Sequence, residues 1–432
     1  MIELLREKRQ FFVTLLLWWL VAQYVGETAA YLFIPFTILN FWKKEMYEEL
    51  FVGFFFMLLM SSKVEFARNF KDIYVLILFA VVAFSKEMRF NTRMLMFFTP
   101  FFFVAFICLF FSDILFQSFQ KTLSYLLMLL IIPTYIDHIY TEKGPSFFKT
   151  ITILVILFLL LGLVMRYISP EEVYLIGRYR GVFLFNPNGL GLFLMLFFLY
   201  YSIITDIYPD LFEFKEELFI YGLSILILYM CESRSSIIAS LIFLFFKSFY
   251  KISPAIGFII FVVVAALYQV IEENTQPLII ALGLGDYFRI ETIDTGSGRY
   301  VAWEFAWTNI QENFYIGKGI GYTDFLFHKY FNELAVLGHV GNAHNSYLTI
   351  WLDTGLIGLL CYMFALVFNF IKSTKISHLA IPVMYAVLFS VYYESWLSAS
   401  LNPYTIQVFS ILAILTSDVI RQKKEEGIIS VQ

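Results

Sequence analysis

His344 and Asn345 stand where a polar segment becomes apolar, in GNAHNSYLTIWLDTGLIG over residues 341–358. Asn345 or Ser346 can cap the helix that the apolar run predicts. The partial positive charge at a helix N-terminus disfavours a charged imidazole, so we expect His344 to be neutral. A neutral histidine can remove the proton of an attacking hydroxyl, which accelerates a reaction by roughly 10²–10⁴-fold. The alternative is a histidine that only caps the helix or packs against it.

Three arginines lie in polar segments beside apolar runs: Arg180 in RGVFLFNPNGLG, Arg234 in CESRSS and Arg299 directly after DTGSG. A guanidinium is always charged and donates paired hydrogen bonds to a phosphate. For Arg180 and Arg234 the alternative is an ordinary contact with lipid headgroups, and Arg234 can also pair with Glu232. Asn188, in the Asn-Pro-Asn turn after Arg180, can cap the helix that follows.

Permanent cations and a neutral imidazole together suit the displacement of a lipid-linked diphosphate. Arginines stabilise the charge that builds up on such a leaving group, and the histidine acts as the base. Because the arginines take the place of a metal cation, we expect no metal and no cofactor. A metal site at His339 and His344 would need a third ligand and a better-supported spacing. The three cysteines have no paired spacing, which argues against a disulfide framework or a zinc site.

The composition is that of a membrane protein. The 432-residue chain is 60% hydrophobic, and only 15% of its residues are charged, whereas a soluble domain has about 25%. Its 52 Phe and 28 Tyr residues suit lipid-facing surfaces and membrane interfaces. A net charge of −4 is too small to indicate a nucleic-acid partner.

The apolar runs predict an all-α, polytopic membrane protein with about 12–14 transmembrane helices, because about 20 apolar residues cross a bilayer. The runs lie near 11–25, 29–42, 49–62, 73–85, 93–111, 121–137, 147–168, 188–205, 217–230, 235–249, 254–271, 346–371, 378–393 and 404–420.

The distribution of Lys and Arg predicts a cytoplasmic N-terminus. Lys63, Arg68 and Lys71 then fall on the outer side and oppose this orientation. Four polar segments would share the outer side, and all candidate residues named so far lie in or beside them. They are 166–188, 231–236, 272–345 and 394–404.

We therefore divide the chain into spans over 1–271, an extracytoplasmic loop over 272–345 and C-terminal spans over 346–432. Within the loop, an amphipathic helix is expected to begin near Arg299, after Gly296 and Gly298, which allow close backbone approach. Its apolar side would lie on the membrane surface or cover a cavity, or pack on the rest of the loop. That side consists of Tyr300, Trp303, Trp307, Ile310 and Phe314.

Several motifs resemble, in order and spacing, the O-antigen ligase/polymerase family of bacterial polysaccharide assembly. They are RGVFLFNPNGLG, SRSS, GSGRYVAWEFAW with GKGIGY, and AHNSYLTIWLDTGLIG, with a weaker similarity at ESWLSASLNP. The His–Asn pair before a span that contains Gly-x-x-Gly is the most specific of these. The first 170 residues match only as generic spans.

The resemblance implies a metal-independent, inverting transfer of an undecaprenyl-diphosphate-linked oligosaccharide to an acceptor hydroxyl. It implies that Arg180, Arg234 and Arg299 hold the diphosphate and that His344 is the base. It also implies a bacterial inner-membrane location, with the active site on the extracytoplasmic face. We expect supporting roles for Asn188, Asn345, Asp353 and Glu394. Asp353 stands where the family is expected to have Glu.

We interpret the chain as a polysaccharide polymerase that joins lipid-linked repeat units, with a chain-length regulator as a further partner. The closest alternative is a ligase, whose acceptor is lipid A-core or another acceptor. A flippase or transporter of lipid-linked sugars would need ionisable residues inside the spans and repeated halves, which the sequence lacks. A membrane-embedded glycosyltransferase of the peptidoglycan type would not require the His–Asn pair.

Overall fold

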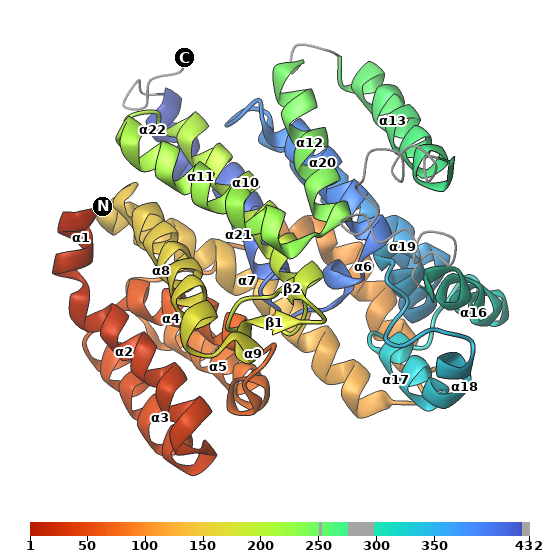
Figure 1. Ribbon diagram of the computed structural model, residues 1–432, viewed down its shortest axis with the longest axis horizontal. Coiled ribbons are helices and arrows are strands. Elements are labelled where there is room, and N and C mark those ends of the chain that lie inside the picture. Colours follow the sequence, from red (N-terminus) through yellow and green to blue (C-terminus); the bar gives the residue numbers. More distant parts are fainter. Residues whose placement is uncertain (250–252, 275–297, 426–432) are drawn as a thin grey trace.

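The computed structural model describes residues 1–249, 253–274 and 298–425 (Figure 1). The first half of the chain forms helices of different lengths. They are α1 (Ile2–Glu7), α2 (Arg9–Leu20), the π-helix η1 (Val21–Val25), α3 (Glu27–Lys43), α4 (Tyr47–Met60), α5 (Glu65–Phe84), α6 (Arg93–Leu109), α7 (Leu115–Lys143), α8 (Ser146–Ile168) and α9 (Pro170–Val173).

A small hairpin, β1 (Tyr174–Leu175) and β2 (Arg178–Tyr179), separates these helices from the second half of the chain. The elements that follow are α10 (Pro187–Ile207), α11 (Phe214–Cys231), α12 (Arg234–Ser248), α13 (Pro254–Asn274), α16 (Arg299–Glu312), α17 (Tyr322–Lys329), α18 (Phe331–Val336), α19 (Ser346–Ser373), α20 (Ala380–Tyr393), the 3₁₀ helix η4 (Trp396–Ser398), α21 (Thr405–Thr416) and α22 (Asp418–Glu425).

Every predicted apolar run coincides with a helix, so the chain is a multi-pass helical membrane protein. Four helices in the described part are long and apolar enough to cross a membrane by themselves, namely α7, α8, α10 and α19. Shorter apolar helices occupy the runs at α6, α13, α20 and α21. The count of 12–14 crossings and the division at 272 and 345 stay predictions.

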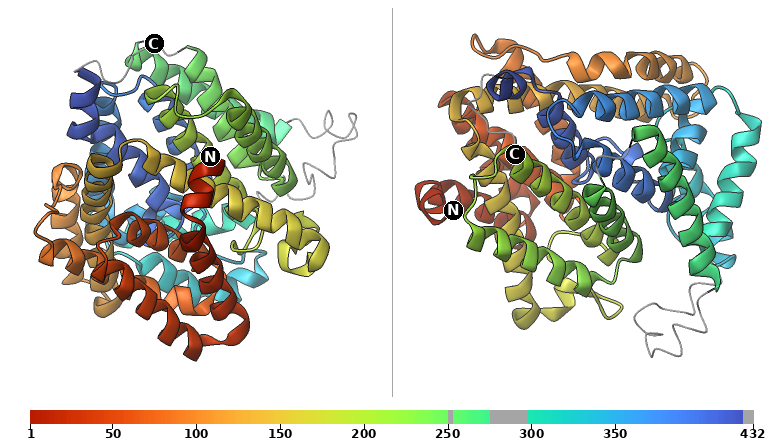
Figure 2. Two further views of the ribbon diagram at one scale, coloured as in Figure 1. Left: turned by 90° about the vertical axis from the view of Figure 1, so that its left-hand side faces the viewer. Right: turned by 90° about the horizontal axis from the view of Figure 1, so that it is seen from above.

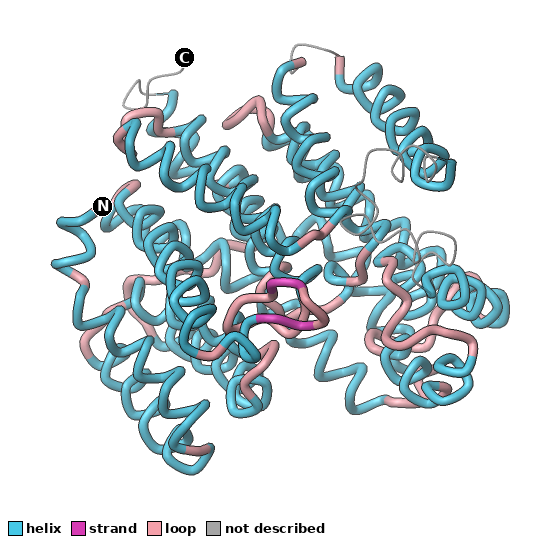
Figure 3. Tube along the Cα trace, in the orientation of Figure 1, coloured by secondary structure: helices cyan, strands magenta, loops and turns pink. Residues whose placement is uncertain are grey.

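The β1–β2 hairpin is a small addition to the predicted all-α fold. Leu175 pairs with Arg178 in an antiparallel register (Figure 3, magenta). Between them, Ile176 and Gly177 have φ values of 49° and 75°, as the two central residues of a type I′ turn require. The hairpin follows the end of α8 and brings an arginine-rich strand toward the N-terminus of α10.

One end of the bundle gathers loops that the sequence predicts to be extracytoplasmic. Lys63 Nζ lies 3.3 Å from Glu172 Oε2, and Lys71 Nζ donates to the Leu401 carbonyl at 2.9 Å. Both partners belong to predicted outer segments. The Lys63 and Lys71 side chains, which opposed the predicted orientation, therefore have polar protein partners at that end.

The opposite end gathers the predicted cytoplasmic segments. The Met1 amino group lies 2.7 Å from Glu216 Oε1. Lys8 and Lys143 both pair with the buried Glu48, at 2.6 and 2.8 Å. Figure 1 shows α1 and α22 at this end and α16, α17 and α18 at the other. The contacts thus sort the loops into the two sets that the alternation of spans predicts.

Helix α19 begins beside the candidate residues and is interrupted at Gly355, which has φ 74° and ψ 175°. The break frees the Leu356 N–H, which donates to the Phe314 carbonyl at 2.9 Å. A Cβ at position 355 would lie 2.2 Å from the Tyr315 carbonyl oxygen. Non-helical backbone is tolerated at membrane depth when protein satisfies its polar groups, and the chain from Phe314 does so here.

Helix α19 also packs along α6, which runs beside it (Figure 2, right, α6 orange and α19 blue). This contact holds the broken helix against the rest of the bundle over its apolar length. It leaves the two ends of α19 at opposite ends of the molecule.

The buried side of helix α16 is shifted from the predicted apolar side and shares Ile310 with it. Ala302, Ala306 and Ile310 are fully buried, whereas Tyr300 and Trp307 are 44% and 40% exposed. The small alanines let the α16 backbone approach its neighbours, and the Trp307 ring packs edge-on against Trp351 of α19 at 5.4 Å. The helix therefore packs on α19, and its aromatic residues form the edge of that contact.

Candidate active site

His344 and Glu394 face each other across the start of α19. The His344 Nδ1 atom lies 3.3 Å from Glu394 Oε2. His344 has a φ of 45°, a left-handed conformation that is uncommon for a residue with a side chain and that often marks functional sites. Asn345 is the N-cap of α19 and accepts from the Leu348 N–H at 3.1 Å, as the sequence predicts.

Two further hydrogen bonds hold the segment of Glu394 against the start of α19. The Ser346 hydroxyl donates to the Glu394 carbonyl at 2.8 Å. The Asn345 N–H donates to the Ser395 hydroxyl at 2.9 Å. The position of Glu394 relative to His344 is therefore set by backbone contacts as well as by the side chains.

Arg299 lies on the other oxygen of the same carboxylate. Its Nη2 is 3.5 Å from Glu394 Oε1, and its guanidinium lies over the Tyr393 ring at 5.6 Å. Arg299 is the first residue of α16, after Gly298, whose φ is 79°. A Cβ on Gly298 would lie 2.7 Å from the Gly338 carbonyl oxygen, so this glycine permits the predicted close approach, while Gly296 lies outside the described residues.

The Glu394 carboxylate is mostly enclosed, with 17% of its side chain exposed. Burial alone would raise the pKa of Glu394, but His344, Arg299 and a hydrogen bond from the Asn188 amide together hold that pKa below its ordinary value. Glu394 is therefore an anion at neutral pH, with the Arg299 guanidinium and the His344 ring beside it. The sequence identified it only as a weak acidic candidate.

Asn188 reaches this site because another residue caps α10. The Asn186 side chain is the cap and accepts from the Gly189 N–H at 2.6 Å, so the expectation that Asn188 is the cap is wrong. The Asn188 Oδ1 instead accepts from Arg178 Nη2 at 2.8 Å, and the Asn188 side chain also helps to lower the pKa of Glu394. The side chain thereby links an arginine to the central carboxylate.

Arg178 is the residue that the sequence analysis missed. Its Nη2 donates to the Cys231 and Glu232 carbonyls at 2.7 and 3.0 Å. Burial and the nearby charge of Arg234 lower the pKa of Arg178, so the two guanidinium groups are electrostatic neighbours. Arg178 thus anchors the hairpin to the α11–α12 turn that carries Arg234. The Ile-Gly turn directly before Arg178 is the local signal that identifies this anchored strand.

The Arg180 side chain points away from Glu394. Its guanidinium donates to the Phe185 and Glu171 carbonyls at 3.2 and 3.3 Å, and its charge lowers the pKa of Lys63, which burial has already reduced. Arg180 is two residues from Arg178, so their Cα atoms are at most about 7 Å apart. The structure nevertheless places the Arg180 side chain beside Lys63 and not on Glu394.

The glycines of the NPNGLG motif allow these loops to meet. A Cβ on Gly191 would lie 2.4 Å from the Ser233 Cβ, and one on Gly189 would lie 2.4 Å from the Tyr404 hydroxyl. The N-terminus of α10 therefore packs directly against the SRSS turn and the segment after Glu394. The three motifs of the sequence analysis become one contact region.

The surroundings of Asp353 indicate a structural role for its carboxylate. It is buried in α19, and its carboxylate accepts from the Gly321 N–H at 2.8 Å and from the Thr323 N–H and hydroxyl at 2.8 and 2.7 Å. A Cβ at Gly317 would lie 2.3 Å from the Asp353 carbonyl carbon. Asp353 therefore holds the GKGIGY segment against α19, and this segment holds the loop that ends at His344.

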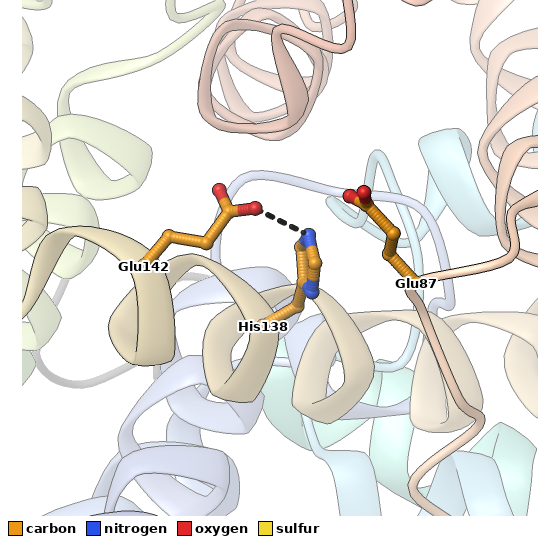
Figure 4. Close-up of side chains that lie close together, drawn as sticks. All are labelled: Glu87, His138 and Glu142. Carbon is orange, nitrogen blue, oxygen red and sulfur yellow. Dashed lines mark ion pairs between the residues drawn. The ribbon is translucent and has the colours of Figure 1, made fainter.

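Two other histidines, His339 and His138, differ from His344 in their surroundings. The buried His339 ring packs edge-on against His344 at 5.8 Å, and burial lowers the pKa of His339. At the opposite end of the bundle, His138 lies with Glu87 and Glu142, their nearest ligand atoms within 4.8 Å of one another (Figure 4). His138 already pairs with Glu142 at 3.1 Å, and both carboxylates belong to exposed residues, so we assign this group to a local ion pair.

In the described site, His344 lies beside one oxygen of the Glu394 carboxylate and Arg299 lies beside the other. Asn188 connects this group to Arg178. Its residues come from five separate segments of the chain. Such a set can remove a proton from a hydroxyl and bind an anion next to it.

Part of the chain matches a known protein family. Residues 219–363 match the model of a family described as O-antigen ligase, and the resemblance inferred from the motifs is thereby confirmed. The match includes Arg234, Arg299 and His344, whereas Arg178, Asn188 and Glu394 lie outside it. No curated protein matches the chain significantly.

Proposed function

We propose that the chain, whose residues 219–363 match the O-antigen ligase family, is an inverting polysaccharide polymerase. The donor is an undecaprenyl-diphosphate-linked glycan, and the acceptor is a sugar hydroxyl of a new lipid-linked repeat unit. The site acts at the extracytoplasmic face of the bacterial inner membrane. The observation that carries the proposal is the His344–Glu394 pair with Arg299 on the second carboxylate oxygen.

In this proposal His344 accepts the proton of the attacking hydroxyl at Nε2. Glu394 holds the other ring nitrogen, Nδ1, in its protonated form and stabilises the imidazolium that results, as the carboxylate of a catalytic triad does. The acceptor oxygen forms a bond to the anomeric carbon while the bond from that carbon to the phosphate oxygen breaks. Attack from the face opposite the diphosphate inverts the anomeric centre.

The arginines bind the departing diphosphate. The Arg299–Glu394 distance of 3.5 Å is longer than the 2.7–2.9 Å or so of a strong charge-assisted bond, so a phosphate oxygen can replace the carboxylate on this guanidinium. Arg234 is the second ligand in the proposal. Arg180 can join them only by giving up its present carbonyl partners. No metal ion is required, because these cations neutralise the charge.

Replacing Arg299 with lysine is expected to lower the rate of glycan transfer about 10- to 100-fold, because an ammonium cannot donate the paired bonds of a guanidinium. Purified protein in nanodiscs, with lipid-linked repeat units as substrate, measures this rate. Arg166→Lys is the matched control, since Arg166 also lies over an aromatic ring, that of Tyr174 at 5.9 Å, but belongs to the end of α8. Equal rates in both variants would show that Arg299 does not bind the diphosphate.

A ligase is the second candidate, because the matching family is described by that activity. Both reactions use the same donor and the same groups, and they differ only in the acceptor. A polymerase binds a second lipid-linked repeat unit, whereas a ligase binds lipid A-core or another acceptor.

Deletion of the gene separates the two functions. We expect the ladder of polymer lengths to disappear on gel electrophoresis while single repeat units remain attached to their acceptor. Restoration by the wild-type gene is the control. Loss of every attached unit, including single ones, would identify the chain as the ligase.

A further inference from the structure

A cavity of about 420 Å³ lies at the opposite end of α19 from His344. It is enclosed by the start of α6, the end of α19 and the α21–α22 junction. Since α19 has 28 residues, its length of about 40 Å separates this cavity from the candidate active site. The distribution of Lys and Arg assigns this end to the cytoplasmic side.

Four cationic side chains and one carboxylate line the cavity. The cations are Arg93, Lys372, Lys375 and Arg421, and the carboxylate is Asp418. Asp418 is shared, because it contacts Arg93 and also lies 3.3 Å from Arg421 Nη2. One carboxylate against four cations leaves the lining with an excess of three positive charges.

Cytoplasmic helix ends commonly carry Lys and Arg, but these four side chains line one cavity. The Lys372 ammonium is held 4.5 Å from the centre of the Phe97 ring and 4.9 Å from that of Phe368. Cation–π contacts of this kind orient a lysine at a defined place. The positive charge of Lys372 is therefore held at the cavity.

A buried acceptor lies in the same wall. Asn369 is fully buried, and its Nδ2 donates to the Ala365 carbonyl at 2.8 Å. Its Oδ1 has no hydrogen-bond partner within the described chain. A buried acceptor without a partner is costly, so a ligand that carries a donor is favoured at this point of the lining.

Apart from Thr416 and Ser417, the remaining wall is apolar, and it leads to exposed apolar side chains on the surface of the bundle. Met96, Phe97, Ile376 and Leu415 contribute to it. Met96 is 65% exposed, and Ile371, next to Lys372, is 45% exposed. A ligand with a charged head and hydrocarbon chains fits this combination better than a wholly polar one.

We propose that the cavity binds the headgroup of an anionic phospholipid, with phosphatidylglycerol as the best match. The lysines and arginines contact the phosphate diester. A glycerol hydroxyl donates to Asn369 Oδ1, and the acyl chains leave along Met96 and Ile371. Basic pockets between transmembrane helices on the cytoplasmic side bind such headgroups.

The test uses the full-length protein, freed of lipid in a neutral detergent, and measures lipid binding by native mass spectrometry and by thermal stabilisation. Phosphatidylglycerol is expected to bind and raise the unfolding temperature, because a ligand of the native state stabilises it. Phosphatidylcholine should do neither. The variant Lys372→Gln, Lys375→Gln should bind phosphatidylglycerol about 10- to 30-fold more weakly.

Lys43→Gln, Lys44→Gln is the matched control, because it removes two exposed lysines at the same end of the bundle but away from the cavity. Equal weakening in both double variants would overturn the site and leave a general effect of charge. Binding of phosphatidylcholine as strong as that of phosphatidylglycerol would overturn the role of the cations. Stabilisation by glycerol phosphate equal to that by the lipid would overturn the assignment to a lipid.

Discussion

Replacing His344 with alanine is expected to lower the rate of glycan transfer by about 10²- to 10⁴-fold, the usual contribution of a general base. The imidazole is the proposed base, 3.3 Å from Glu394, and alanine leaves no group to take the proton. Turnover of lipid-linked repeat units in nanodiscs measures the effect, and polymer length in cells provides a second reading. Membrane insertion should be unchanged, because Asn345 continues to cap α19.

His328→Ala is the control for this variant. His328 lies in α17, in the same insertion, and is exposed, so its loss should leave the rate of transfer unchanged. Wild-type polymer in the His344→Ala variant would exclude His344 as the base. A comparable loss in both variants would indicate damage to the insertion and not to the chemistry.

Replacing Glu394 with glutamine is expected to lower kcat about 10²-fold or more, through the orientation of His344. A carboxylate accepts from the protonated Nδ1 and stabilises the imidazolium, whereas a glutamine amide donates to Nδ1 and leaves the proton on Nε2. The imidazole then cannot accept the proton of the hydroxyl. The measurement is kcat and KM with lipid-linked repeat units, and Glu394→Asp should restore part of kcat.

The pH dependence separates this role from a merely structural one. The pKa of Glu394 lies below its ordinary value of 4.5, so Glu394 stays ionised as the pH falls from 8 to 5, and its own contribution is lost only below that range. Any loss of wild-type activity between pH 8 and 5 therefore reports a group other than Glu394, and in the proposed pairing that group lies next to the Glu394 carboxylate. In Glu394→Gln this loss should shift in pH or disappear. Glu333→Gln, at an exposed residue of α18, should keep the wild-type profile, and an unchanged profile in Glu394→Gln would contradict the pairing.

The candidate site could be predicted only in part. His344, Arg234 and Arg299 stand in recognisable motifs, and the alternation of spans placed their loops at one end of the bundle. Arg180 was preferred to Arg178 although the two lie in the same strand segment, because a turn motif does not say which guanidinium is enclosed by the α11–α12 turn. Asn186 and Asn188 were likewise confused, since either asparagine of the Asn-Pro-Asn turn suits a cap.

Asp353 is a residue that the sequence suggests for the site but that the structure places among other partners. A buried carboxylate two turns into a membrane helix resembles a catalytic acid on sequence grounds. Its partners, Gly321 and Thr323, lie about 30 residues away, and only the break at Gly355 lets that segment reach α19. The sequence contains both glycine-rich segments but does not indicate that they pack together.

The amino-acid sequence by itself determined the helices, the cap at Asn345 and the sorting of loops between the two ends of the bundle. These features depend on local hydrogen bonds, on apolar length and on the charge of short segments, which a single stretch of chain contains. Only the tertiary structure decided that Glu394 is the partner of His344, that Arg178 is anchored by the α11–α12 turn, and that four cations converge on one cavity. Those contacts depend on which helices are neighbours, and helix neighbours are chosen by packing across the whole bundle, which no local period records.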